Sequence, residues 1–277
     1  GALVVDDHIH DTVRYLPDWK PNYGLDGEVG SLGALSVDGG FSQPNGRSPA
    51  PDPAMLTGTR LAAMLAARGV TISAGVRRGV ASTSAHEIAH VDSPSVSDIV
   101  GEMLTSSDDY TAEILLRNLA VVPDGRQPAT TAAGAAIVAQ DMSHLGVPTD
   151  GLVMHDGSGL APNDQATCAT LLRLIEVTAR PRFAAVDKGL AIAGSSGTLA
   201  GRFVGDPLAG KLRAKTGSLN GVVGLVGVID GPNDLHFAFV ANGNFSTAGG
   251  AQLQANVASA IGSTPDVRLP AGLVPPP

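Results

Sequence analysis

The 277-residue sequence predicts an α+β fold in which helices come first and an antiparallel sheet lies near the C-terminus. Apolar residues recur at helical spacing between about residues 94 and 179. After residue 210 the pattern becomes that of strands, over 222–229 and 235–240, with the turn residues 230–233 between them. Strands joined by a short turn pair antiparallel, so these two segments predict the sheet.

The first quarter of the chain is rich in turns and contains one clear helix. Residues 1–50 are turn-rich, and 43–53 is expected to be a linker or exposed turn, because three prolines fall in its last six residues. A helix is expected from about Pro53, with Gly69 as its C-terminal stop. Apolar and polar residues then alternate over 70–74, which predicts a strand.

The remaining helices are predicted from apolar residues spaced three or four positions apart. They are expected over about 94–104, 110–119, 128–145, 166–179 and, more weakly, 248–261. The proline-rich end, 263–277, is expected to be a tail.

Composition and charge exclude several classes of function. The net charge is −8, and no cluster of basic residues exceeds Arg77-Arg78, which argues against nucleic acid or an anionic membrane as a partner. Apolar residues make up 43% of the chain, but no apolar run approaches the roughly 18 residues of a membrane span. The single cysteine, Cys168, cannot form an internal disulfide and is expected to be a small buried apolar residue.

The strongest chemical feature is Lys215-Thr216-Gly217, which begins an amphipathic strand and contains one of only four lysines. Acyl transfer on a peptide needs a nucleophile, a proton relay, a cation for the substrate carboxylate and donors for the oxyanion. A strand carrying Lys and Thr can hold that carboxylate, and Gly allows close approach. Taken alone, the tripeptide is a weak signal, and an ordinary exposed turn is its favoured interpretation.

Three further segments accompany this tripeptide. Ser107-Asp108-Asp109 lies in a break between two predicted helices, and the Gly-rich run 156–160, Asp-Gly-Ser-Gly-Leu, precedes another helix. Gly197-Thr198-Leu199, with Arg202 shortly after it, precedes the Lys215 strand. A structural turn is the favoured interpretation of 156–160, and a structural charge that of Arg202.

Together these motifs resemble the class C low-molecular-mass penicillin-binding proteins, which are D-alanyl-D-alanine carboxypeptidases and endopeptidases. The family's Ser-Asp-Asn-x-x-Ala-Glu-x-Leu-x-Arg is similar to 107–117, and its Asp-Gly-Ser-Gly-Leu is intact at 156–160. Its Gly-Thr-Leu-x-x-Arg and Arg-Ala-Lys-Thr-Gly are similar to 197–202 and 213–217. The resemblance covers about residues 1–262, in the family's order.

The resemblance implies the penicillin-recognising transpeptidase fold, shared with serine β-lactamases, in which an antiparallel sheet is flanked by helices. It also implies cleavage of the terminal D-Ala-D-Ala bond of peptidoglycan stem peptides through an acyl-enzyme, with β-lactams as covalent inhibitors of the complete enzyme. No metal or cofactor and no nucleic acid partner is implied. An exported location, periplasmic or associated with the cell wall, is expected.

The same resemblance implies a role for each site residue. Ser107 would relay a proton and Lys215 would supply positive charge. The hydroxyls of Thr216 and Ser218 would hold the substrate carboxylate, Gly217 would let the substrate approach, and the Ser218 backbone N–H would form half of the oxyanion hole.

One element of the family is missing, because no serine in the chain has a lysine three residues later. The nucleophilic Ser-x-x-Lys and the first two strands are therefore expected upstream of residue 1, which leaves the sheet with an unpaired edge and the fold incomplete at the N-terminus. Residues 1–92 are expected to be a remnant of the family's inserted domains, and 93–262 the C-terminal half of the transpeptidase domain. A catalytically dead protein that binds wall peptides is the alternative.

The resemblance places Asp109 at a substrate-binding position, where the family has Asn. An Asn amide can donate a hydrogen bond to the substrate carbonyl, whereas an ionised Asp cannot. Asp109 is expected either to pair with Lys215, to be protonated in a dry site, or to cap the following helix.

A competing motif is His86-Glu87-Ile88-Ala89-His90, which matches the His-Glu-x-x-His of zinc metallopeptidases. On a helix this spacing places both imidazoles on one face for zinc and the glutamate beside them as base. Pro94 leaves room for barely two helical turns, and the third histidine of the extended motif is absent. A zinc metallopeptidase is therefore the second alternative.

Overall fold

The computed structural model describes residues 1–44, 46–122 and 127–263, which form two compact units. The first unit contains residues 1–99 and 108–166, and the second contains 100–107 and the chain from Thr167 onward. The units therefore do not divide at residue 92, and the assignment of 1–92 to inserted domains stays a prediction. The expected tail, 263–277, lies outside the described residues except for Ser263.

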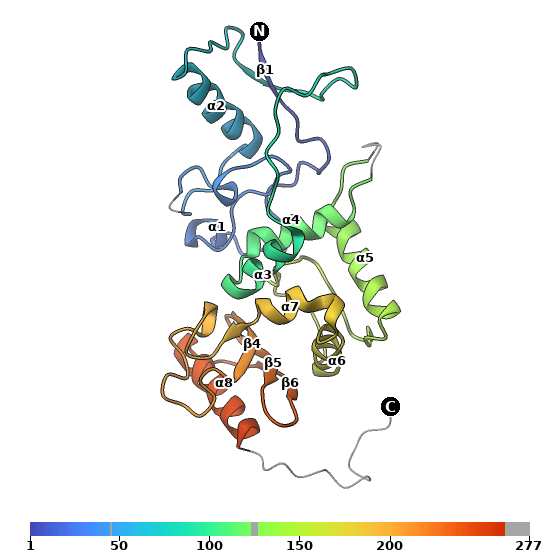
Figure 1. Cartoon of the computed structure of the whole chain (residues 1–277), viewed down its shortest axis with the longest axis vertical. Helices are drawn as coiled ribbons and strands as arrows, with labels where there is room; N and C mark the ends of the chain where they lie inside the picture. The colour runs from blue at the N-terminus through green and yellow to red at the C-terminus, as the bar shows by residue number, and fades with distance from the viewer. Residues whose placement is uncertain (45, 123–126, 264–277) are drawn as a thin grey trace. The chain divides into compact units, whose positions relative to one another are not determined.

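The first unit contains a small parallel sheet, β1 (Leu3–Val5) with β2 (Val76–Arg78), and a set of helices. The helices are α1 (Tyr23–Asp26), the 3-10 turn η1 (Asp38–Gly40), α2 (Pro53–Ala66), α4 (Asp109–Leu119) and α5 (Thr131–His144). Helix α2 packs against β1 and β2 (Figure 1).

Helix α2 begins where the sequence predicts. The Asp52 carboxylate accepts the Met55 N–H at 3.1 Å, and Pro53 occupies the first turn, where its missing N–H costs nothing. The helix ends at Ala66, and Gly69 follows it with φ +84°. The strand predicted over 70–74 is wrong, since the strand forms at 76–78. The partner β1 has only three residues, and its register with β2 starts at Leu3 opposite Val76.

The second unit is built around a four-stranded antiparallel sheet in the order β3-β4-β5-β6. The strands are β3 (Ala191–Ile192), β4 (Leu212–Leu219), β5 (Val222–Ile229) and β6 (Leu235–Asn242). The helices and turns are α3 (Val96–Ser106, from residue 100), α6 (Cys168–Thr178), η2 (Pro181–Phe183), α7 (Ala184–Gly189), η3 (Gly197–Leu199) and α8 (Thr247–Gly262). Within the described chain, β3 and β6 are the two edge strands of this sheet, and the expectation that further strands are missing from it stays a prediction.

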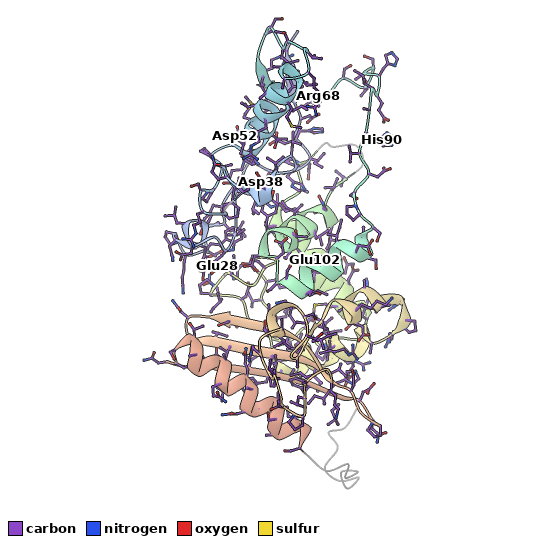
Figure 2. The ribbon with its side chains drawn as sticks, turned by 60° about the vertical axis from the view of Figure 1, so that its left-hand side comes forward. Glu28, Asp38, Asp52, Arg68, His90 and Glu102 are labelled. Atoms are coloured by element: carbon purple, nitrogen blue, oxygen red, sulfur yellow. The ribbon has the colours of Figure 1, made fainter. Side chains whose placement is uncertain are left out.

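Helices cover both faces of this sheet. Helix α8 runs along one face (Figure 2), where Ala258 joins Leu225 and Phe237 in the core. Helix α6 covers the other face, where Ile175 packs with Val228. This arrangement confirms the predicted α+β class. Cys168 is exposed at the start of α6, so its expected burial is wrong.

Candidate functional site

The structure brings Ser107 and Lys215 together in the second unit. The Lys215 ammonium lies in the middle of β4 and donates to the Ser107 hydroxyl over 2.6 Å and to the Thr216 carbonyl over 2.9 Å. Ser107 follows the last residue of α3 and has φ +59°, a left-handed conformation that costs a residue with a Cβ about 1–2 kcal/mol. Such strain is characteristic of functional positions, and here it places the hydroxyl on the cation.

Contacts with Gly189 of α7 hold the end of α3 in place. The Thr105 hydroxyl donates to the Gly189 carbonyl at 2.9 Å, as well as to Gly101 in its own helix. A Cβ on Gly189 would come within 2.9 Å of the Gly101 Cα, so the two backbones touch. This close approach needs glycine at position 189 and holds the end of α3, which Ser107 follows, against α7 within the second unit.

Strand β4 is fixed by β5 and by α8. Gly217 lies opposite Gly224 in the register, and the buried Gln254 amide of α8 donates to both of their carbonyls, at 3.0 and 2.7 Å. The Thr216 hydroxyl is hydrogen-bonded to that of Thr198 at 2.9 Å. Ser218 is exposed on the same strand, so its hydroxyl can be reached from outside.

A cavity of about 480 Å³ opens beside these residues, within the second unit. Lys215, Thr216, Gly217 and Gly224 contribute its polar and backbone edge. The rest of the lining is apolar apart from Thr178 and comes from α3, α6, α7 and the sheet: Val100, Met103, Leu104, Leu171, Leu174, Ile175, Val186, Leu190, Val226 and Val240. An added Cβ at Gly217 would meet no atom closer than 3.8 Å, so packing within the described chain does not require glycine there.

Asp109 belongs to the first unit, as the first residue of α4. The cap of that helix is its neighbour Asp108, which accepts the Thr111 N–H at 3.0 Å and the Thr111 hydroxyl at 2.6 Å. The expectation that Asp109 is the cap is therefore wrong by one residue. The Asp108 side chain satisfies the first-turn donor.

The turn 156–160 of the first unit is structural, as expected. The buried Asp156 carboxylate accepts the N–H groups of Gly159 and Ala161, each at 2.7 Å. Glu113, fully buried, accepts the N–H groups of Gly157 and Ser158, also at 2.7 Å. Burial, followed by the neighbouring Asp156, raises the pKa of Glu113.

Asp164 completes a group of three carboxyls and was not singled out by the sequence. Burial raises the pKa of Asp164 to about 7, and a hydrogen bond and charge from Asp156 add to this effect. Its Oδ1 accepts the His155 N–H at 2.7 Å. Three carboxyls so close together favour retention of a proton near neutral pH.

The zinc interpretation of residues 86–90 is wrong. The segment contains no helix and is exposed, with Ile88 98% accessible, and Figure 2 shows His90 on extended chain. His90 Nδ1 pairs with the Glu87 carboxylate at 2.7 Å, which this extended backbone permits. In the described parts of the chain, no three or more His, Cys, Asp or Glu side chains gather as a metal site. Among the described helices, none combines the length and apolar character needed to cross a bilayer.

Comparisons with known proteins show to which family the chain belongs. The model of the D-Ala-D-Ala carboxypeptidase 3 (S13) family matches residues 48–261. Carboxypeptidase DacB of Mycolicibacterium smegmatis is 30% identical over 256 residues, which is 86% of this chain and 53% of the relative. The D-alanyl-D-alanine carboxypeptidase of Actinomadura sp. (strain R39) is 33% identical over 207 residues, 71% of this chain and 38% of the relative. The chain thus spans about half, or less, of the length of these relatives.

Among solved structures, penicillin binding protein 4 (dacB) from Haemophilus influenzae superposes with a TM-score of 0.80 at 19% sequence identity. The match covers 94% of this chain and 74% of the other. A second structure of that protein, complexed with a β-lactam, superposes with a TM-score of 0.65 at 23% identity, over 76% of this chain and 52% of the other. These likenesses confirm the predicted fold.

Proposed function

Since this chain belongs to the D-Ala-D-Ala carboxypeptidase 3 (S13) family, we propose that it is part of a serine-type carboxypeptidase or endopeptidase that acts on peptidoglycan stem peptides. The observation that carries the proposal is the 2.6 Å hydrogen bond from Lys215 to Ser107. A hydroxyl held on an ammonium is suited to passing a proton, because the cation stabilises the oxygen when its proton leaves. Relatives named as carboxypeptidases support the substrate class.

In the proposed reaction a serine outside this chain attacks the carbonyl carbon of the penultimate D-Ala. The oxyanion accepts hydrogen bonds, one of them from the Ser218 N–H. Ser107 gives its proton to the leaving amine, so that D-Ala departs, and recovers a proton from the group that deprotonated the nucleophile. Water then hydrolyses the acyl-enzyme. Lys215, Thr216 and Ser218 hold the terminal carboxylate.

The cavity supports a nucleophile supplied by a further helix. Its lining is almost wholly apolar, and the α3 residues Val100, Met103 and Leu104 that face it are only partly buried. Apolar surface of this kind is stabilised when another apolar face covers it, at about 25 cal/mol per Å². A Ser-x-x-Lys helix seated there would bring its serine to the side of Lys215 and Gly217. A Cβ added at Gly217 would meet no atom closer than 3.8 Å, so the described chain leaves room beside Gly217 for such a helix.

We further propose an exported location, periplasmic or cell-wall associated, where peptidoglycan is found. β-Lactams are the expected covalent inhibitors, and the neighbouring structure complexed with a β-lactam supports this choice of probe. The alternative is a protein that binds wall peptides but lacks a nucleophile. It would keep the Lys215 strand and form no acyl-enzyme.

The deciding experiment measures the intact mass of the protein from its native source, with and without labelled penicillin. We expect a species heavier than the 27.9 kDa of this chain that gains one covalent adduct. Lys215→Ala should reduce the acylation rate strongly, whereas the exposed Lys211→Ala should leave it unchanged. A 27.9 kDa species without adduct would favour the wall-peptide-binding protein.

A further inference from the structure

The turn η3 joins the two parts of the site in the second unit. In this structure the Thr216 hydroxyl of β4 donates over 2.9 Å to the hydroxyl of Thr198, in the middle of the turn. Gly197 has φ +54°, and a Cβ there would overlap the Thr105 carbonyl oxygen near the end of α3. Leu199 is fully buried in the core cluster that contains Leu212 of β4. The turn is therefore held at each of its three residues, so the Thr198 hydroxyl has a fixed place beside Thr216.

The direction of this hydrogen bond decides what Thr216 can bind. Each threonine hydroxyl has one proton to donate and two lone pairs that accept. If Thr216 gives its proton to Thr198, it presents only lone pairs to a ligand, which repel an anion. If Thr198 donates instead, the Thr216 proton is free for a carboxylate oxygen. Hydroxyls that donate in series polarise one another, which strengthens the final bond to the anion.

We propose that Thr198 is a positioning residue for recognition of the substrate carboxylate, acting through Thr216. This inference rests on the proposed function in one respect, namely that the ligand of Thr216 is a carboxylate. When an anion is present the direction of this hydrogen bond reverses: Thr198 donates to Thr216, and the Thr216 proton is oriented toward the anion. The Lys215 ammonium, on the neighbouring residue, favours an anionic ligand at the same place. The ligand class is a peptide that ends in a free carboxylate.

The test is direct binding to the 277-residue chain, which needs no nucleophile. Two probes are titrated by NMR: an acetylated peptide ending in D-Ala-D-Ala as the free carboxylate, and the same peptide as its C-terminal amide. The wild-type chain should prefer the carboxylate. Thr198→Val keeps the shape of the side chain and removes the hydroxyl. It should weaken carboxylate binding about tenfold, because the Thr216 proton is no longer oriented toward the anion, and leave amide binding unchanged.

Two controls separate positioning from a general structural effect. Thr198→Ser, which restores the hydroxyl, should restore the preference for the carboxylate. Thr59→Val removes an exposed hydroxyl that is bonded within α2 and should change neither titration. The inference is overturned if the wild-type chain shows no preference for the carboxylate. It is also overturned if Thr198→Val weakens both probes equally or neither, or if serine fails to restore binding.

Failure of this inference differs from failure of the proposed function. A Thr198-dependent preference for the carboxylate, together with no penicillin adduct on the native protein, would overturn the acyl-enzyme and leave the role of Thr198 standing. A penicillin adduct with carboxylate binding that is independent of Thr198 would do the reverse.

Discussion

The indole N–H of Trp19 donates a 2.8 Å hydrogen bond to the Asp156 carboxylate, 137 residues further along the chain. Both side chains are buried, with exposed fractions of 4% and 2%. The Asp156 carboxylate also accepts hydrogen bonds from the N–H groups of Gly159 and Ala161. One carboxylate therefore fixes the Gly-rich turn and attaches it to the N-terminal loop. A buried anion must be satisfied by several donors at once, and here the donors come from both segments.

Replacing Trp19 by Phe should therefore destabilise the first unit. The change leaves one buried carboxylate oxygen with fewer donors, at a cost of about 1–3 kcal/mol. Urea unfolding followed by far-ultraviolet circular dichroism measures the effect. Part of any loss comes from the smaller ring, so the hydrogen bond is isolated by a cycle with Asp156→Asn and the double variant. A coupling energy near zero would contradict the assigned role.

The sequence predicts the helices and the long strands β5 and β6 better than the short strand β2. Helix starts carry local signals, such as the side chains of Asp52, Thr130 and Thr167, each of which accepts a first-turn N–H. A short strand depends on a partner far away in sequence, and 70–74 lacks one while 76–78 pairs with 3–5. Local pattern cannot reveal that choice.

The same distinction holds for the candidate site. Ser107 and Lys215 were predicted, because their motifs are local and the family resemblance supplies their pairing. The sequence does not predict the hydrogen bond from the Gln254 amide to the Gly217 carbonyl or the one from the Thr105 hydroxyl to the Gly189 carbonyl. Amide and hydroxyl side chains are common, and nothing in the sequence pairs residues 37 and 84 positions apart. The motif at 86–90 failed for the opposite reason: its spacing suits a helix, but its side chains have no surface to pack against.

The pH dependence of stability should report on Asp164. Its pKa is raised to about 7 in the folded protein, against about 3.9 in an unfolded chain, so the folded state holds the proton more tightly. Stability from this group is present at low pH and is lost as the pH rises from about 4 to about 7. The charged groups that face it are Asp156 and Glu113, and both oppose its ionisation.

Asp164→Asn should remove most of this loss. An amide can donate to the Asp156 carboxylate as the protonated acid does, and it does not ionise. The urea midpoint of the wild-type chain should fall between pH 5 and pH 8 by more than that of Asp164→Asn. Asp150→Asn, which removes an exposed carboxyl of the same unit, should follow the wild type. Parallel curves for all three proteins would show that Asp164 is ionised throughout.

The left-handed backbone at Ser107 predicts a separation of stability from activity. Ser107→Gly relieves the strain of φ +59°, whereas Ser107→Ala keeps it, so the glycine variant should be about 1 kcal/mol more stable than the alanine variant. Both remove the hydroxyl bound to Lys215 and should slow penicillin acylation of the native protein by about a hundredfold or more. Equal unfolding midpoints for the two variants would mean that the strain is absent, and wild-type acylation in either would remove Ser107 from the proton path.

Two glycines in helices should respond to the same substitution with opposite signs. Gly134 of α5 lies against α4, where a Cβ would overlap the Leu116 carbonyl oxygen, and a backbone atom cannot yield as a side chain can. Gly134→Ala should therefore destabilise the first unit by about 1–3 kcal/mol, even though alanine favours helix by about 1 kcal/mol. A Cβ at Gly101 of α3 would meet no atom within 4 Å, so Gly101→Ala should stabilise by up to about 1 kcal/mol. Urea unfolding of both variants tests the pair. If Gly134→Ala is also stabilising, the backbones of α4 and α5 do not approach as closely as this structure places them.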